Sequence, residues 1–230
     1  MISITGDTHG DFRRVAYFCD TLGTSPHDIL IILGDAGINY YEDYRDTNLK
    51  VQLADLPITL FCIHGNHEAR PEGTGRYEEE LWHGGKVFVE RKYPNVLFAK
   101  DGEVFNLDGT KAIVIGGAYS VDKYYRLERG WKWWNNEQPD EKTRAYVERQ
   151  LVSMDNQIEV VISHTCPLKY EPIEVFLAGI DQSTVDKSTE TWLDTIEERI
   201  QYRKWYCGHY HTEKQIDRLE FLFGSIKEFA

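Results

Sequence analysis

Residues 1–10, MISITGDTHG, join a short run of apolar and β-branched residues to a polar cluster. Ile2 to Thr5 has the composition of a β-strand, and Gly6 lets the backbone turn sharply after it. Asp7 and His9 follow at once. An α/β sheet places its ligands at such positions, just beyond the carboxyl ends of its strands. The opening of the chain therefore predicts a strand that carries part of a functional site.

Four later places repeat this junction between a strand-like run and a polar cluster. They are Gly34-Asp35, Gly65-Asn66-His67-Glu68, Ser163-His164 and Gly208-His209-Tyr210-His211. Each follows a short apolar run, and continuous apolar runs suit strands that are buried on both faces. Several separate strand ends are thus expected to contribute to one cleft.

The polar residues at these junctions are of metal-ligand types. The candidate metal ligands are Asp7, His9, Asp35, Asn66, His164, His209 and His211. A mixture of oxygen and imidazole donors suits Mn, Fe or Zn better than Ca or Mg, and it lacks the thiolates of a structural zinc site. Seven donors are too many for one tetrahedral ion. Two divalent ions are expected, manganese before iron or zinc, with one shared carboxylate giving each ion four protein ligands.

Strand-like and helix-like stretches alternate along the rest of the chain. Phe12, Val15, Ala16, Cys19 and Leu22 fall on one face of a helix. The order of the stretches predicts an α/β protein with two stacked mixed β-sheets flanked by helices. Because the candidate ligands come from both ends of the chain, one domain over residues 1–230 is expected. Loop insertions are expected near 70–86 and 120–138.

The composition of the chain indicates which partners it can bind and in which cell compartment it is expected. The chain has 230 residues, 41% of them hydrophobic, and a net charge of −12. An acidic protein without a basic stripe is a poor binder of extended nucleic acid or of anionic membrane. No apolar run approaches the roughly 20 residues that span a bilayer, and the first strand leaves no room for a signal peptide. These features predict a cytoplasmic protein with four reduced, buried cysteines, and they leave the oligomeric state open.

In chain order, GDTHG, GD, GNHE, a lone histidine after a strand and GHYH resemble the calcineurin-like metallophosphoesterase family over nearly the whole sequence. The resemblance implies a four-layer αββα sandwich. It also implies that Asp7, His9 and His211 hold one ion, that Asn66, His164 and His209 hold the second, and that Asp35 bridges the pair.

The resemblance further implies a reaction. Two cations roughly 3.5–4 Å apart would hold a bridging hydroxide, which attacks phosphorus in line. His67 would lie beside the ions without ligating them and would protonate the departing alkoxide as a general acid. The expected function is therefore hydrolysis of a phosphate ester, with His67 and Asp35 as the catalytic residues.

The sequence departs from the protein-phosphatase branch of this family. In that branch a further Asp and an Arg follow the second GD, and an Arg precedes GNHE. Here Ala36 and Gly37 follow Asp35, and His64 precedes Gly65. The residue that usually orients the catalytic histidine, here His67, is therefore missing from its usual position, and so are two arginines that bind phosphate. A small phosphodiester, with nucleotides among the candidates, is expected before a phosphomonoester or phosphoprotein. An inactive metal-binding scaffold is a further alternative.

Three residues are candidates for substrate binding, namely His64, Arg70 and Arg126. The aromatic residues between Tyr124 and Trp134 are expected to form the private core of a long loop, although rings of this kind can also stack a nucleobase. Residues 181–190 are polar and are a candidate lid. Glu68 is expected to brace the turn of the GNHE motif.

Overall fold

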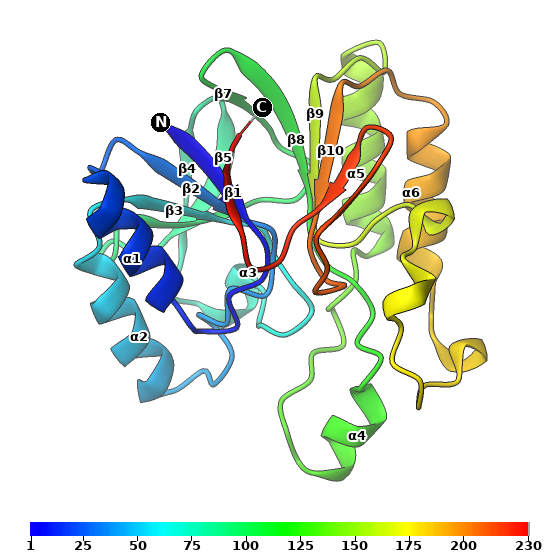
Figure 1. Ribbon diagram of the computed structural model, residues 1–230, viewed down its shortest axis with the longest axis horizontal. Coiled ribbons are helices and arrows are strands. Elements are labelled where there is room, and N and C mark those ends of the chain that lie inside the picture. The colour runs from blue at the N-terminus through cyan, green and yellow to red at the C-terminus, as the bar shows by residue number, and fades with distance from the viewer. Residues whose placement is uncertain (230) are drawn as a thin grey trace.

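The computed structural model describes residues 1–229 and contains two β-sheets that lie face to face, with helices on the outer side of each (Figure 1). Within these residues the first sheet has seven strands, in the order β13 (Ile226–Glu228), β1 (Ile2–Thr5), β2 (Ile29–Ile32), β3 (Thr59–Cys62), β6 (Val96–Ala99), β5 (Gly85–Val89) and β4 (Glu78–Trp82). The second has six, in the order β11 (Lys214–Ile216), β12 (Leu219–Phe221), β10 (Lys204–Cys207), β9 (Val160–Ser163), β8 (Thr110–Ile115) and β7 (Val104–Leu107).

Two helices cover each sheet (Figure 1). They are α1 (Arg13–Leu22) and α2 (Tyr44–Ala54) on the first sheet, and α5 (Glu141–Ser153) and α6 (Ser188–Glu197) on the second. The connections hold the short helices α3 (Pro71–Thr74) and α4 (Lys123–Glu128) and the 3-10 turns η1 (Leu168–Tyr170), η2 (Ile173–Val175) and η3 (Gln182–Thr184). Helix α4 lies at the tip of a loop that extends beyond the sheets (Figure 1).

Three hydrophobic layers hold the four structural layers together. The central layer lies between the sheets and includes Ile31 and Phe61 from the first sheet and Val114 and Ile162 from the second. The two outer layers join each sheet to its own helices. Buried apolar area of this kind is the main stabilising contribution to a fold. The expected α/β architecture of two stacked mixed sheets is confirmed. The expectation of a single domain over residues 1–230 stays a prediction.

The segment 70–86 is more regular than expected. It contains α3 and the strand β4, whose residues Glu78 and Glu79 are exposed. Strand β4 pairs antiparallel with β5 at the edge of the sheet. Its sequence, EEELW, has no apolar alternation, so the strand depends on this pairing and not on its own pattern. None of the helices in residues 1–229 is long and apolar enough to cross a membrane.

Candidate metal centre

The sheet topology brings the polar junctions to one edge of the molecule. Strands β1, β2 and β3 are parallel neighbours in one sheet, and β9 and β10 are parallel neighbours in the other. The carboxyl ends of parallel strands meet at the same edge. Each expected ligand follows one of these five strands within a few residues. The two sheets therefore present their ligand-bearing turns to a common cleft.

The turns that carry the ligands have unusual backbone geometry. His9, Asp35, His209 and His211 have φ values of 46°, 45°, 65° and 50°, in the left-handed region that non-glycine residues rarely adopt. Such conformations persist where the surrounding structure enforces them, and they cluster at functional sites. Close approach adds a second constraint, because a Cβ at Gly34 would overlap the ring of His164. The GD motif needs its glycine for this reason.

One half of the site consists of the buried Asp7 and of two exposed histidines, His9 and His211. The Nε2 atoms of the two histidines lie 2.9 Å apart. Asp7 Oδ2 lies 3.3 Å from His211 Nε2 and 3.8 Å from His9 Nε2. Within residues 1–229 this buried oxygen has no hydrogen-bond partner. Three ligand atoms thus converge on one point, as a bound cation would require.

The other half is buried and contains a pair of facing acceptors. His164 Nδ1 lies 2.7 Å from the carbonyl oxygen of Leu33, which can only accept, so Nδ1 carries the proton. Asn66 Nδ2 donates to Ser120 Oγ over 2.9 Å, so its Oδ1 faces His164 Nε2 at 2.8 Å. When the imidazole of His164 is neutral, its Nε2 and the Oδ1 of Asn66 are both acceptors. Two facing acceptors repel each other, and a cation bound by both would remove this repulsion. A metal-binding histidine usually donates its other N–H to a carbonyl or carboxylate, as His164 does to Leu33.

Carboxylates connect the two halves. Among the described residues, three groups of His and Asp side chains have ligand atoms within 4.8 Å of one another, and these are Asp7–His9–His211, His9–Asp35–His67 and Asp7–Asp35–His164. Asp35 belongs to two of these groups and is 2% exposed. The ring of His209 lies 5.0 Å from that of His164. The seven side chains singled out from the sequence therefore lie together, and their donor set fits two divalent ions.

His67 has a partner that the sequence did not reveal. Arg126 Nη1 donates to His67 Nδ1 over 2.7 Å, and a guanidinium is always a donor. Nδ1 therefore accepts and the ring proton lies on Nε2, which is 3.7 Å from Asp122 Oδ1. Burial lowers the pKa of His67, and the charge of Arg126 lowers it further. The hydrogen bond from Arg126 occupies Nδ1 and leaves the Nε2–H as the donor of the ring.

Helix α4 fixes the position of Arg126. The side chain is 1% exposed, and its Nε donates to the carbonyl of Lys132 over 2.8 Å. The rings of Tyr40 and Trp134 lie 5.4 and 5.9 Å from the guanidinium. The loop at 120–138 thus serves as a support for His67.

Of the other two proposed substrate contacts, Arg70 is paired elsewhere and His64 is buried. Arg70 forms an ion pair with Asp101 at 2.6 Å, and its Nε donates to the carbonyl of Asn136. His64 is 3% exposed, and burial holds its pKa well below the ordinary value. Neither residue lines the cavity at the metal centre, so a direct role in substrate binding stays a prediction for both. Glu68 Oε1 accepts from the backbone N–H of Gly65, as expected for a brace.

The aromatic residues of the 120–138 loop do not form a private core. Tyr124, Tyr125 and Trp131 are 68%, 48% and 50% exposed. That expectation is wrong for these three rings, because the short helix α4 presents Tyr124 and Tyr125 outward and buries Arg126 instead, and Trp131, which follows the helix, is also exposed.

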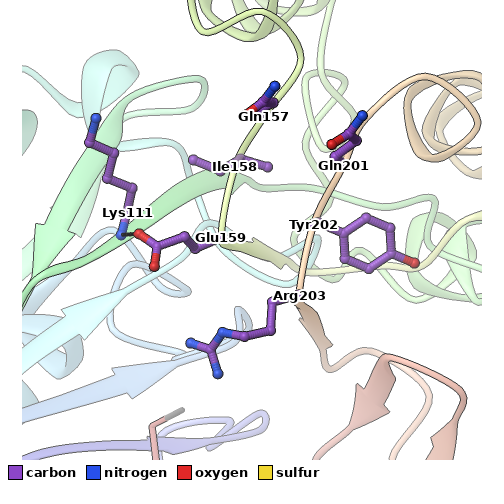
Figure 2. Close-up of a pocket in the computed structure, with 7 residues that line it drawn as sticks. All are labelled: Lys111, Gln157, Ile158, Glu159, Gln201, Tyr202 and Arg203. Carbon is purple, nitrogen blue, oxygen red and sulfur yellow. Dashed lines mark hydrogen bonds between the residues drawn. The ribbon is translucent and has the colours of Figure 1, made fainter.

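A second cavity, of about 430 Å³, lies at the amino ends of β8, β9 and β10 (Figure 2). Its lining includes Lys111, Glu159 and Arg203, and the carboxylate of Glu159 accepts from the backbone N–H of Lys111 over 2.8 Å. None of the His and Asp groups found in residues 1–229 lies there. The chemistry is therefore concentrated at the carboxyl ends of the strands.

Comparison with known proteins agrees with this arrangement. Residues 1–213 match the model of the calcineurin-like phosphoesterase family. No curated protein matches the chain. A crystal structure of TT1561 from Thermus thermophilus superposes with a TM-score of 0.52 at 12% identity, covering 96% of this chain and 87% of that one. AQ665 from Aquifex aeolicus, a protein of unknown function, gives a TM-score of 0.34 at 13% identity over 74% and 81% of the two chains.

The structural likeness at this identity shows the shared fold alone. The match over residues 1–213 includes all five motif-bearing turns, from Asp7 to His211. The chain belongs to the calcineurin-like phosphoesterase family, whose members are hydrolases that act on phosphoester bonds.

Proposed function

We propose that this protein hydrolyses a small phosphodiester with two divalent metal ions, manganese before iron or zinc. The residues that would hold the ions are Asp7, His9, Asp35, Asn66, His164, His209 and His211. The observation that carries the proposal is the pair of facing acceptors, Asn66 Oδ1 and His164 Nε2, at 2.8 Å. When bound, the ions would supply Lewis-acid stabilisation of the phosphoryl oxygens and a nucleophilic water at neutral pH.

The chain's own residues have separate tasks. Asp35 accepts from the backbone N–H of His67 over 2.7 Å, which ties the proposed bridging carboxylate to the histidine's own turn. Arg126 holds the His67 ring with Nε2–H free to donate. In this role His67 gives the Nε2 proton to the oxygen that departs as an alkoxide, while the positive charge of Arg126 at Nδ1 offsets the negative charge left on the ring.

The charge of the cavity supports a diester. Among the described residues that line it there is no Lys or Arg, whereas Asp122, Glu171 and Glu190 all line it. A monoester dianion would need compensating positive charge at its free oxygens, and the metal ions would have to supply all of it. A diester carries one negative charge and an additional organic group, so it suits this cavity better.

The test uses metal-free protein reconstituted with Mn²⁺. We expect faster turnover of bis-p-nitrophenyl phosphate than of p-nitrophenyl phosphate at equal concentration. Turnover of the monoester alone would support the phosphomonoesterase alternative. Stoichiometric uptake of metal without turnover of either ester would support the scaffold alternative.

A further inference from the structure

The segment between residues 171 and 187, here the 171–187 loop, forms one side of the cleft (yellow in Figure 1). An ion pair closes its base, with Lys187 Nζ 2.7 Å from Glu171 Oε2. Above the base, the ring of Phe176 stacks on Tyr210, with the centroids 6.1 Å apart and the planes 14° from parallel. Tyr210 belongs to the GHYH motif, so the loop is attached directly to the metal-binding turn. A loop with joined ends and its own packing is a compact functional element.

The wall that this loop presents to the cavity is mainly apolar. Val175, Leu177, Ile180 and Val185 line it, opposite the metal ligands. Three aromatic rings, those of Tyr119, Phe176 and Tyr210, also line the cavity. Its volume of about 390 Å³ is within the range of small-molecule sites, which are apolar with a few well-placed polar groups.

Glu190 is a buried polar residue of this cavity, and one of its oxygens is unpaired among the described residues. Glu190 lies in the first turn of α6 and is 4% exposed. Its Oε1 accepts from Thr165 Oγ1 over 2.8 Å, whereas its Oε2 has no hydrogen-bond partner within residues 1–229. A buried acceptor without a donor costs free energy. Burial also raises the pKa of this carboxyl to about 7.

We propose, on the basis of the function proposed above, that this cavity binds the organic group of the ester, and that this group is aromatic and carries an N–H donor. The donor pairs with Glu190 Oε2, and the ring packs against the apolar residues of the 171–187 loop. The three aromatic rings favour a planar group over an aliphatic chain, because aromatic pairs gain stabilisation beyond their buried area. An amino-substituted aryl group and a nucleobase with an exocyclic amine share this chemistry.

Two nearly isosteric diesters test the role of Glu190, namely methyl 3-aminophenyl phosphate and methyl 3-methylphenyl phosphate. Each has a single ring, so that ring alone can fill the cavity. We expect the Mn²⁺-loaded protein to prefer the amino ester by about tenfold in kcat/KM, because its N–H would pair with the buried Oε2 that otherwise has no donor in the described part of the chain. Hydrolysis of both esters at equal kcat/KM would overturn the subsite and leave the proposed function intact. Hydrolysis of neither ester, nor of bis-p-nitrophenyl phosphate, would overturn the proposed function itself.

The variant Glu190→Gln makes the test specific. Its amide oxygen would accept from Thr165, which turns the NH₂ group toward the cavity and replaces an acceptor with a donor. We expect the amino preference in kcat/KM to disappear or reverse. The control is Glu174→Gln, since Glu174 lies on the same loop, pairs with Lys214 and does not line the cavity. A preference that survives Glu190→Gln would contradict the assignment.

A second variant covers the case in which Glu190→Gln fails to fold. We expect Phe176→Ala to lower kcat/KM for both aryl esters by a similar factor and to retain the amino preference. Loss of the amino preference in this variant, with the rates otherwise unchanged, would contradict the proposal that Phe176 packs on the ring while Glu190 accepts from the N–H donor. To identify the source of the ring, the methyl esters of adenosine 5′-phosphate and of its analogue without the 6-amino group are compared. If the amino group raises kcat/KM more in the nucleotide pair, the organic group of the natural ester is a nucleoside. If it raises kcat/KM more in the aryl pair, the organic group is a smaller aromatic alcohol.

Discussion

The two halves of the metal centre differ in how the protein holds them. In the buried half, His164 has a fully buried side chain that is fixed by the carbonyl of Leu33, and Asn66 is fixed by Ser120. In the other half, the side chains of His9 and His211 are 36% and 48% exposed; their rings contact each other, and that of His211 also stacks on Phe223 with the centroids 4.5 Å apart. The buried half is organised by hydrogen bonds to the protein, whereas the exposed half relies mainly on contacts between rings. We infer that the first ion binds in the buried half and that the second exchanges more readily.

The largest effect is expected where the two halves meet. Asp35→Asn removes the charge of the proposed bridging carboxylate, so both ions should bind weakly and turnover should fall by about 10³-fold or more. The measurement is metal content after dialysis, together with kcat for bis-p-nitrophenyl phosphate. Asp11→Asn is the control, because Asp11 is exposed and, within residues 1–229, its carboxylate pairs with the nearby Arg13 alone. Two fully occupied sites in Asp35→Asn would refute the bridge.

The next effect separates proton delivery from metal binding. His67→Ala should keep both ions but slow methyl phenyl phosphate by about 10²-fold, and methyl p-nitrophenyl phosphate much less, because the better leaving group needs little protonation. Arg126→Met should act in the same direction and more weakly, since the ring remains but loses its orientation. Arg129→Ala, a change on the exposed side of the same loop, should have no effect. Equal slowing of good and poor leaving groups would contradict the role of His67 as the proton donor.

A smaller effect is expected on the free energy of unfolding, which compares the two halves of the metal centre directly. In the presence of chelator, His164→Ala should lower the free energy of unfolding by about 2 kcal/mol, because it leaves a cavity and an unpaired carbonyl at Leu33. His211→Ala should change it by no more than about 0.5 kcal/mol, as expected for an exposed side chain. Urea unfolding measures both, and the exposed His27→Ala serves as the control. Equal losses in the two ligand variants would show that the halves are equally organised by the protein.

The sequence predicts the parts of this molecule whose signal is local. Strand β2 is a continuous apolar run and β3 is apolar after Thr59, and the polar cluster after each can be seen in the sequence. Strand β4, with its three glutamates, forms through pairing with β5, and β13 forms through pairing with β1 across the length of the chain. Such strands depend on tertiary context and leave no periodic pattern.

The same distinction applies to the site. The seven ligand-type residues could be assigned because each follows a strand and a shared edge of the sheets gathers them. The partner of His67 could not, because Arg126 lies 59 residues further along in a six-residue helix. Glu190 was also missed, since a lone glutamate in the first turn of a helix resembles an ordinary surface charge until its burial is known.

The most direct test of the account is the number of ions that the folded chain binds. Native mass spectrometry of protein reconstituted with Mn²⁺ counts them without any assumption about substrate. We expect two ions per chain in the wild type and one in His211→Ala, because the buried half remains complete in that variant. A wild-type protein that binds a single ion, or none, would contradict the account.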